Sequence, residues 1–256
     1  MHTMTDTRFV GKVALVTGAG RGMGRATALT LAAGGAIVAV NDINAAAAQK
    51  VADEIVAAGG KARAWACDVT DAAAVQKMVK EIAAAFGTIH ILVNNAGILR
   101  PNRPVEEIPD DEWELVMRVN VTGVFYCTKA VLPLMKAQRY GRIINVSSSA
   151  GRSTSTFGGA HYTASKAAVL GLTRHTARDA ARYGITVNAT APGSIDTEMV
   201  REMSTPERMA KEAAANPLGR LGTAQDEADL VAFLASDAAS YITGATIDLN
   251  GGDLMI

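Results

Sequence analysis

Short apolar runs and longer amphipathic stretches alternate along the whole chain. The apolar runs end at glycines or polar residues, which is typical of buried parallel strands, and they cover residues 13–17, 36–40, 62–67, 89–93, 142–146, 185–189 and 246–249. The stretches between them have helical periodicity and cover residues 22–33, 45–58, 71–86, 110–135 and 225–234, with a further helix around residues 162–166.

Glycines and capping residues mark the ends of these predicted helices. Glycine pairs at 34–35 and 59–60 stop two of them, and Asp71 is a good N-cap for a third. Pro133 near the end of the helix over 110–135 predicts a bent or broken last turn. The stretch 196–216 is polar, contains methionines and is interrupted by Pro206, so it predicts helical fragments over the surface.

Alternation of strands and helices with short connections is typical of βαβ units. We therefore predict an α/β protein with a Rossmann-type, doubly wound parallel sheet of about seven strands and helices on both faces. No Pro/Ser-rich linker or change in composition divides the chain, so residues 1–256 are expected to form a single domain.

Composition and charge favour a compact protein without a polyanionic partner. Apolar residues make up 49% and aromatic residues 5%, so small aliphatic side chains form the core. The 25 basic residues balance the 25 acidic ones, and a net charge of zero creates no field that would attract nucleic acid or an anionic membrane.

The cysteines, histidines and N-terminal residues narrow the class further. Cys67 and Cys127 form no Cys-x-x-Cys motif and the histidines are scattered, so we expect reduced thiols and no metal site. The first residues have no apolar core of a signal peptide, and no run approaches the roughly 18 apolar residues of a membrane span. We expect a soluble cytoplasmic protein, with either Met1 or Met4 as its natural start.

Tyr162 and Lys166 form the first candidate for chemistry. Residues four apart lie on one face of a helix, so the phenol lies beside the ammonium. A free tyrosine has a pKa near ~10, and a neighbouring cation lowers that pKa. The pair suits proton transfer at an alcohol or carbonyl oxygen. An ordinary amphipathic helix also produces this spacing, so the pair alone does not decide.

A glycine-rich turn, TGAGRGMG at residues 17–24, follows the first predicted strand and precedes the first predicted helix. Glycines let the backbone approach a pyrophosphate closely, and the helix N-terminus favours its negative charge. The alternative is a tight structural turn. The position between strand and helix favours a nucleotide site.

Asp42, at the end of the second predicted strand, bears on the type of nucleotide. A carboxylate at this place accepts hydrogen bonds from the adenosine ribose and repels a 2′-phosphate. The alternative role is a helix cap, which Asn44 can fill instead. Arg21 in the glycine turn favours a 2′-phosphate. We weigh Asp42 more heavily and predict NAD, with NADP as the alternative.

Over nearly its full length the chain resembles the classical short-chain dehydrogenase/reductases. The matching motifs, in order, are the TGxxxGxG turn at 17–24, Asp68-Val69, the NNAG motif at 94–97, Asn120, the NVSS motif at 145–148, Tyr162-x-x-x-Lys166, Asn188 and Pro192-Gly193. Together these motifs are highly specific.

The resemblance implies roles for individual residues. It implies a catalytic tetrad of Asn120, Ser148, Tyr162 and Lys166, in which Lys166 also lowers the pKa of Tyr162 and holds the nicotinamide ribose. It implies that the cofactor contacts Gly18, Arg21, Gly22, Met23, Gly24, Asp42, Asp68, Val69, Asn95, Ala96, Gly97, Tyr162, Lys166, Pro192, Gly193, Ile195 and Thr197. It places a substrate-covering segment at about 196–216.

Neighbouring residues leave some choices open. Ser147 and Ser149 flank Ser148; the family pattern selects Ser148, and Ser149 is the alternative because the segment 151–162 is about one residue longer than expected. His161 precedes Tyr162, but the family pattern gives that position no fixed role, so a proton relay through it is disfavoured.

The resulting hypothesis is an NAD(H)-dependent oxidoreductase that interconverts a secondary alcohol and a ketone, with a largely uncharged, small-to-medium substrate. One alternative is an NADP(H)-dependent 3-oxoacyl-thioester reductase, and another is a non-catalytic nucleotide redox sensor. The resemblance also implies a homotetramer, in which the helix after Asp110 and the helix with Tyr162 pair across a two-fold axis. The apolar C-terminal residues 254–256 suit a second interface.

Overall fold

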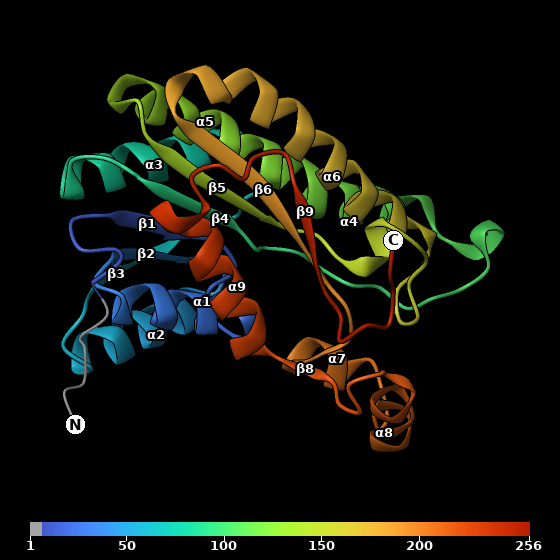
Figure 1. The fold of residues 1–256 in the computed structure, drawn as a ribbon. Helices are drawn as coiled ribbons and strands as arrows, with labels where there is room; N and C mark the ends of the chain where they lie inside the picture. Colours follow the sequence, from blue (N-terminus) through green and yellow to red (C-terminus); the bar gives the residue numbers. More distant parts are fainter. Residues whose placement is uncertain (1–6) are drawn as a thin grey trace.

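The computed structural model describes residues 7–256, so the choice between Met1 and Met4 as natural start lies outside the described residues. In the described part, a seven-stranded parallel sheet forms the middle layer of the molecule, in the order β3-β2-β1-β4-β5-β6-β9 (Figure 1). The strands are β1 Val13–Val16, β2 Ile37–Asp42, β3 Lys61–Ala66, β4 Ile91–Asn94, β5 Gly141–Val146, β6 Ile185–Pro192 and β9 Thr246–Leu249.

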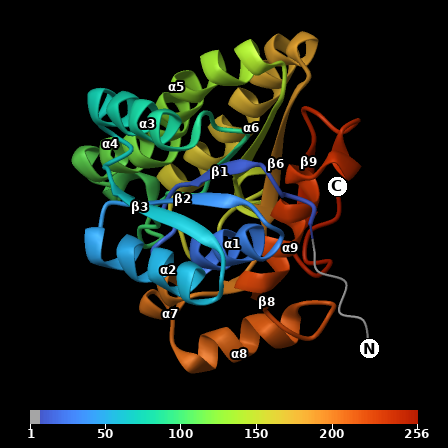
Figure 2. The same cartoon turned by 90° about the vertical axis from the view of Figure 1, so that its left-hand side faces the viewer.

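Helices cover both faces of the sheet (Figure 2). One face carries α1 Gly22–Ala33, α2 Ala45–Ala57 and α9 Ala224–Ala235. The other carries α3 Ala72–Phe86, α4 Asp110–Met117, α5 Gly123–Gln138 and α6 Ala160–Ala180. This is the doubly wound Rossmann-type arrangement predicted from the sequence.

Each face of the sheet has its own apolar core. Leu31 of α1, Ile55 of α2 and Leu234 of α9 are buried against one face. Val79 of α3 and Val131 of α5 are buried against the other. Strands buried on both faces explain why their sequences are continuous apolar runs rather than alternating ones.

The strand order reverses between β1 and β4. In sheets of this type ligands bind beyond the carboxyl ends of the strands at this switch point. Thr17 and Asn95 lie just past β1 and β4, and the Thr17 hydroxyl accepts the backbone N–H of Asn95 at 3.1 Å. The fold therefore brings the glycine turn and the NNAG motif together at this crevice.

The helix ends agree with the sequence analysis, except near Pro133. Asn44 caps α2 by accepting the N–H of Ala47, and Asp71 caps α3. Pro133 lies inside α5, which continues to Gln138, so the predicted broken last turn is wrong. The helix ends instead at Arg139, a non-glycine residue in the left-handed region with φ 53°.

A π-helical segment, η2 Arg118–Thr122, joins α4 to α5 and makes one continuous helix over Asp110–Gln138. This helix has the length and composition of a membrane span, with a mean hydropathy of 1.3 in its most apolar window, although the sequence analysis expected no such helix. Core helices meet the same criterion. Here Val124, Cys127 and Val131 face the protein interior, which accounts for much of that apolar character.

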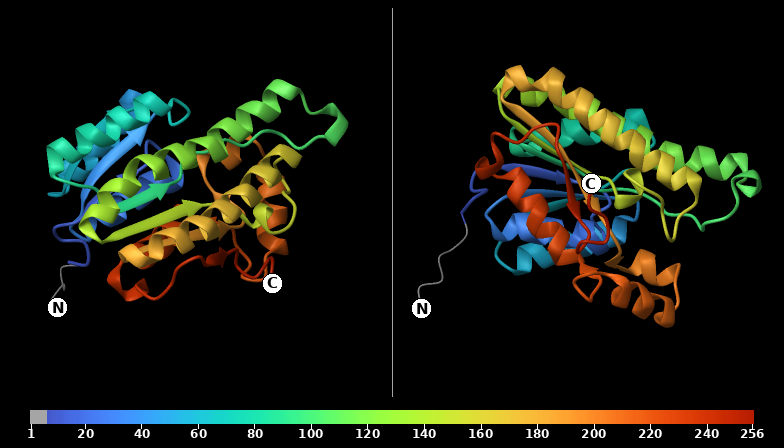
Figure 3. Two further views of the ribbon diagram at one scale, coloured as in Figure 1. Left: turned by 90° about the horizontal axis from the view of Figure 1, so that it is seen from above. Right: turned by 45° about the vertical axis from the view of Figure 1, so that its right-hand side comes forward.

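The segment 196–216 forms the predicted helical fragments beside the sheet. It contains α7 Glu198–Glu202 and α8 Pro206–Ala215, which project beyond the lower layer of helices in Figure 3. A two-stranded ribbon that the sequence analysis missed pairs β7 Ile195–Asp196, at the start of this segment, with β8 Gly222–Thr223, which follows it. The remaining short elements are 3-10 turns: η1 Val105–Glu107, η3 Ser149–Gly151, η4 Ala181–Tyr183 and η5 Asp237–Ala239.

Candidate active site

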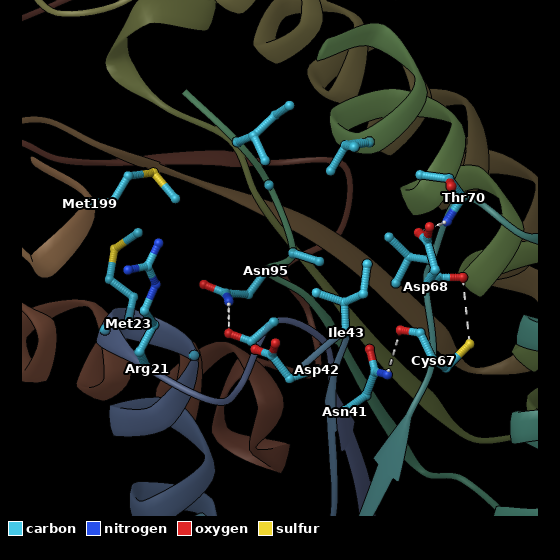
Figure 4. A pocket seen from close by; sticks show the side chains of 18 of the residues that line it. Arg21, Met23, Asn41, Asp42, Ile43, Cys67, Asp68, Thr70, Asn95 and Met199 are labelled. Carbon is cyan, nitrogen blue, oxygen red and sulfur yellow. Dashed lines mark hydrogen bonds between the residues drawn. The ribbon is translucent and has the colours of Figure 1, made fainter. Parts of the chain in front are cut away.

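A pocket opens at the switch point, between the loops after β1, β2, β3 and β4 and the start of α7. Figure 4 shows Arg21, Met23 and Met199 at one end and Asp68 and Thr70 at the other. The lining residues are Gly18, Arg21, Gly22, Met23, Gly24, Asn41, Asp42, Ile43, Cys67, Asp68, Val69, Thr70, Asn95, Ala96, Gly97, Ile98, Leu115, Arg118, Val119, Thr197, Glu198 and Met199.

The glycine turn forms the floor of this pocket through close backbone packing. A Cβ on Gly24 would lie 2.3 Å from the carbonyl oxygen of Gly18, so a larger residue does not fit. Gly18 itself has φ +61°, a conformation that favours glycine. The Asn95 side chain donates to the carbonyl of Gly18 at 2.9 Å and fixes the turn to the loop after β4.

Asp42 closes the glycine turn from the side of β2. Its carboxylate accepts the N–H of Gly20 at 2.9 Å and the N–H of Asn44 at 2.9 Å. Because Asn44 caps α2, Asp42 remains at the pocket wall, as the sequence analysis allowed. Arg21 instead forms an ion pair with Glu202 of α7 at 2.6 Å.

Tyr162, Ser148 and Lys166 meet beyond the ends of β5 and β6. Tyr162 and Lys166 lie one turn apart on α6, and the ammonium lies 5.6 Å from the centre of the phenol ring. Lys166 donates to the carbonyl of Val146 at 2.9 Å. The Ser148 hydroxyl is hydrogen-bonded to the Tyr162 phenol. The predicted acid/base, its hydroxyl partner and its cation are thus assembled in one place.

Burial governs the charge of this cluster. It raises the pKa of Tyr162, while the hydrogen bond from Ser148 lowers that pKa by a smaller amount. Burial also lowers the pKa of Lys166 to about 8, against an opposing effect from the carboxylate of Glu227. The expected lowering of the tyrosine pKa by Lys166 does not appear in this structure, because desolvation of the phenol is the larger effect.

Asn120 occupies the π-helical segment and faces the same cluster. Its side-chain amide donates to Ser165 at 3.1 Å, and its oxygen accepts the N–H of Ile98 at 2.8 Å. A Cβ built on Gly97 would lie 3.3 Å from the Asn120 oxygen and 3.6 Å from the Lys166 nitrogen. Gly97 therefore leaves a narrow space in which Asn120 and Lys166 approach each other.

The three adjacent serines have different surroundings. Ser147 is buried and donates to the carbonyl of Lys166 at 2.8 Å. Ser148 faces Tyr162, and Ser149 begins the η3 turn. The geometry therefore favours Ser148 over the Ser149 alternative. His161 is engaged at both ring nitrogens, with the N–H of Tyr162 at 2.8 Å and with Glu112 at 3.0 Å, and so offers no free relay.

The remaining predicted residues divide between the pocket wall and its support. Asp68, Val69, Asn95, Ala96 and Gly97 line the pocket, as does Thr197. Pro192, Gly193 and Ile195 are not among its lining residues, and the Pro192 carbonyl lies 3.4 Å from the Ser148 hydroxyl.

Some functional positions could not be found from the motifs. Asn41, Ile43, Thr70 and Met199 line the pocket through loops whose course no motif fixes. Glu227 lies fully buried near the cluster, and an acidic residue on the apolar face of a predicted helix was the available signal.

Arginines near the substrate side are held by other groups. Arg152 pairs with Asp248 at 2.7 Å and Arg103 with Glu112 at 3.5 Å, while Arg208 of α8 lies over the Phe157 ring at 4.6 Å. Leu99 and Phe157 are buried apolar side chains on this side, and Arg100 next to Leu99 contacts the Leu99 carbonyl at 3.4 Å.

The residues present fit a nicotinamide dinucleotide. The turn at the N-terminus of α1 suits a pyrophosphate, Asp42 suits a ribose, and Val69 and Ile43 offer apolar contact to a base. Such a cofactor, when bound, supplies a hydride.

Comparisons with known proteins give the same assignment. The family described as enoyl-(acyl carrier protein) reductase matches residues 18–253. The 3-oxoacyl-[acyl-carrier-protein] reductase FabG of Escherichia coli is 45% identical over 248 residues, which are 97% of this chain and 99% of the relative. The same-named protein of Pseudomonas aeruginosa is 44% identical over 245 residues, 96% of this chain and 98% of the relative.

Two solved structures share the fold. The 3-oxoacyl-[acyl-carrier protein] reductase of Brucella melitensis superposes with a TM-score of 0.92 at 36% identity, covering 100% of this chain and 97% of that one. Levodione reductase superposes with a TM-score of 0.91 at 35% identity, covering 96% and 98%. The chain belongs to the short-chain dehydrogenase/reductase family of oxidoreductases.

Proposed function

We propose that this protein is a ketoreductase that reduces a 3-oxoacyl thioester to the 3-hydroxyacyl thioester. The observation that supports it is the Ser148–Tyr162–Lys166 cluster beside the dinucleotide pocket, in a chain whose similar relatives are named for this reaction. This reverses the order of the sequence analysis, which favoured an alcohol dehydrogenase and held thioester reduction as the alternative.

In this mechanism each side chain handles the substrate oxygen or supports a group that does. Tyr162 donates its proton to the ketone oxygen as that oxygen gains negative charge. Ser148, hydrogen-bonded to Tyr162, stabilises the same oxygen. Lys166 supplies positive charge beside the phenol, and Asn120 is hydrogen-bonded to Ser165 of the same helix. The burial that raises the pKa of Tyr162 keeps the phenol protonated for reduction.

We propose NAD(H) as the preferred nicotinamide cofactor. The Asp42 carboxylate lines the pocket at the end of β2, where it would face a 2′-phosphate. Arg21, the cation that would favour NADP(H), is paired with Glu202. The position of Asp42 and the pairing of Arg21 therefore both favour NAD(H) over NADP(H).

A second candidate is an oxidoreductase for a free, uncharged secondary alcohol or ketone. The observation that favours it is the apolar surrounding beyond Tyr162, where Leu99 and Phe157 are buried and Arg152 is paired with Asp248. The structural similarity to levodione reductase is consistent with a neutral substrate. A non-catalytic redox sensor is a third possibility, which any turnover would dismiss.

A single set of assays separates these candidates. Turnover is measured as the loss of NADH absorbance at 340 nm. We expect acetoacetyl thioesters of coenzyme A or acyl carrier protein to show a kcat/KM at least tenfold above that of neutral ketones of similar shape. Equal or better turnover of the neutral ketones would favour the second candidate. Running each substrate with NADH and NADPH tests the cofactor proposal at the same time.

We also propose a cytoplasmic homotetramer in which residues 196–216 cover the substrate. Exposed apolar side chains support two contact surfaces: Trp113 and Phe125 on the α4–α5 helix, and Phe233 and Tyr241 near the C-terminal strand.

A further inference from the structure

Glu227 is a buried acid that the mechanism above does not use. It lies in the first turns of α9, on the side where Ala228, Val231 and Leu234 are buried against the sheet. The side chain is fully buried, and its Oε2 atom has no hydrogen-bond partner among the described residues. An apolar side chain at this position would be the more stable choice, because burying a carboxyl with an unpaired oxygen is unfavourable.

A short hydrogen bond holds the other oxygen to the sheet. Thr190 of β6 donates to Glu227 Oε1 at 2.6 Å. The backbone carbonyl of the same Thr190 accepts the N–H of Ser147 at 2.9 Å, and Ser147 in turn donates to the carbonyl of Lys166 at 2.8 Å. Successive hydrogen bonds through Thr190 and Ser147 therefore link Glu227 to the backbone of Lys166 and to the residue that precedes Ser148.

Glu227 and Lys166 approach this strand end from opposite faces of the sheet. Lys166 comes from α6 and binds the carbonyl of Val146, while Glu227 comes from α9 and binds Thr190. Val146 and Thr190 are register partners on β5 and β6. Lys166 and Glu227 are therefore anchored on adjacent strands at the same level of the sheet, and each acts electrostatically on the other.

We propose that Glu227 is a positioning residue of the active site, which fixes the strand end that precedes Ser148 and, in its ionised form, favours the protonated form of Lys166. The proposal rests on the function given above, because it assigns Glu227 to the same proton-transfer cluster. Each group favours the charged form of the other: Glu227 raises the pKa of Lys166, and Lys166 lowers that of Glu227. Burial is the larger effect on Glu227 and leaves its pKa raised to about 8.

Other charged groups near α9 are already engaged. Beta-strand β6 has no ionisable side chain, and Lys166 is the charged residue that acts on Glu227. The charged residues on the surrounding elements are paired as Arg21–Glu202, Arg25–Glu54, Arg142–Asp237, Arg152–Asp248 and Arg220–Asp226, and Asp229 is bonded to Gln225.

The test compares Glu227→Gln with Asp229→Asn, which removes a charge from the exposed side of the same helix. Loss of the Glu227 carboxylate lowers the pKa of Lys166, so the alkaline limb of kcat/KM for ketone reduction should move about one unit to lower pH. Asp229→Asn should leave the limb unchanged. Thr190→Val should move it in the same direction as Glu227→Gln, because it makes Glu227 harder to ionise.

A second measurement needs no turnover. Trace acetylation of Lys166 with acetic anhydride at a series of pH values, quantified by mass spectrometry, reports its pKa in the free protein. The midpoint should fall in Glu227→Gln and not in Asp229→Asn; an unchanged midpoint overturns the proposal. If Glu227→Gln does not fold, Glu227→Leu provides the same comparison. Absence of turnover in the parent protein would count against the proposed function and leave this result interpretable.

Discussion

At the scale of single residues, burial decides how the active site is poised. Tyr162 and Lys166 both lie where water is excluded, and each is shifted toward its neutral form. Reduction needs a protonated phenol on Tyr162. It also needs a protonated, positively charged Lys166, which burial disfavours. Lys166 stays protonated below its pKa of about 8, and the ionised form of Glu227, on the far face of the sheet, extends that range to higher pH.

Tyr162→Phe tests the proton donor. The ring remains and only the hydroxyl is lost, so kcat should fall by roughly 10²–10⁴-fold. NADH binding, measured by fluorescence, should change little, because the packing of the ring is kept. Tyr183→Phe, on η4 away from the cluster, is the matched control and should keep parental activity. Retention of more than a few per cent of kcat would show that another group donates the proton.

Asp42→Ala tests the choice of cofactor. Removing the carboxylate removes its repulsion of a 2′-phosphate, so the ratio of kcat/KM for NADH to that for NADPH should fall by at least tenfold. Asp53→Ala, on the exposed side of α2, removes the same charge outside the pocket and should leave the ratio unchanged. A parental protein that prefers NADPH would instead give Arg21 the larger role.

Single residues also show where sequence reasoning stops. The glycine turn, Asp42 and the Tyr162–Lys166 spacing are local in sequence, so their placement follows from one strand, one turn or one helix. The Arg21–Glu202 ion pair joins residues 181 positions apart, and the Thr190–Glu227 bond joins residues 37 apart. No short motif encodes such contacts, and they arise only once the sheet is assembled.

At the scale of elements, the segment 196–216 is fastened at both of its helices. Glu202 of α7 pairs with Arg21 of the glycine turn, and Arg208 of α8 donates to the Thr156 carbonyl at 2.6 Å. The order of strands and helices was predictable from apolar runs and glycine stops. The ribbon β7–β8 was not, because two-residue strands have no periodicity.

Loosening these contacts should change substrate capture more than chemistry. An exposed ion pair contributes about 0–1 kcal/mol and a hydrogen bond about 0.5–1.5 kcal/mol, so Glu202→Gln and Arg208→Ala should each change thermal stability only slightly. We expect KM for the thioester to rise by roughly two- to fivefold with kcat little altered. Glu212→Gln, elsewhere on α8, is the control. Equal falls in kcat and kcat/KM would mean that the segment acts on the chemical step.

At the scale of the whole molecule, the buried Glu227 and Lys166 make stability depend on pH. The folded-state pKa of Glu227 is about 8, above its ordinary value of 4.5, so the folded protein holds an extra proton between these limits. Stability from this group is therefore present below pH 4.5 and lost as the pH rises through 8. Lys166, with a pKa lowered from 10.5 to about 8, opposes folding fully below pH 8, and this cost is relieved as the pH rises from 8 to 10.5.

Glu227→Leu should consequently be more stable than the parent, and its advantage should grow with pH. We expect little difference near pH 5 and a gain of about 1–4 kcal/mol in free energy of unfolding near pH 8.5, measured by urea denaturation. Activity should fall in the same variant. An advantage that is constant across this range would mean that Glu227 does not titrate in the folded protein.

The exposed apolar side chains of the two proposed contact surfaces predict how the tetramer should come apart. Phe125 on α5 belongs to one surface, and Tyr241, the most exposed large apolar side chain among the described residues at 103%, belongs to the other. In a tetramer with two-fold axes each surface joins a different pair of chains.

Light scattering should give a mass near four chains of 26.6 kDa for the parent. Phe125→Glu and Tyr241→Glu should each give dimers, and the double variant should give monomers, because each buried glutamate opposes one interface. Val56→Glu, which replaces an exposed apolar residue on α2 outside both surfaces, should remain tetrameric. A parent mass near one chain at micromolar concentration would refute the assembly, and a tetrameric double variant would place its interfaces elsewhere.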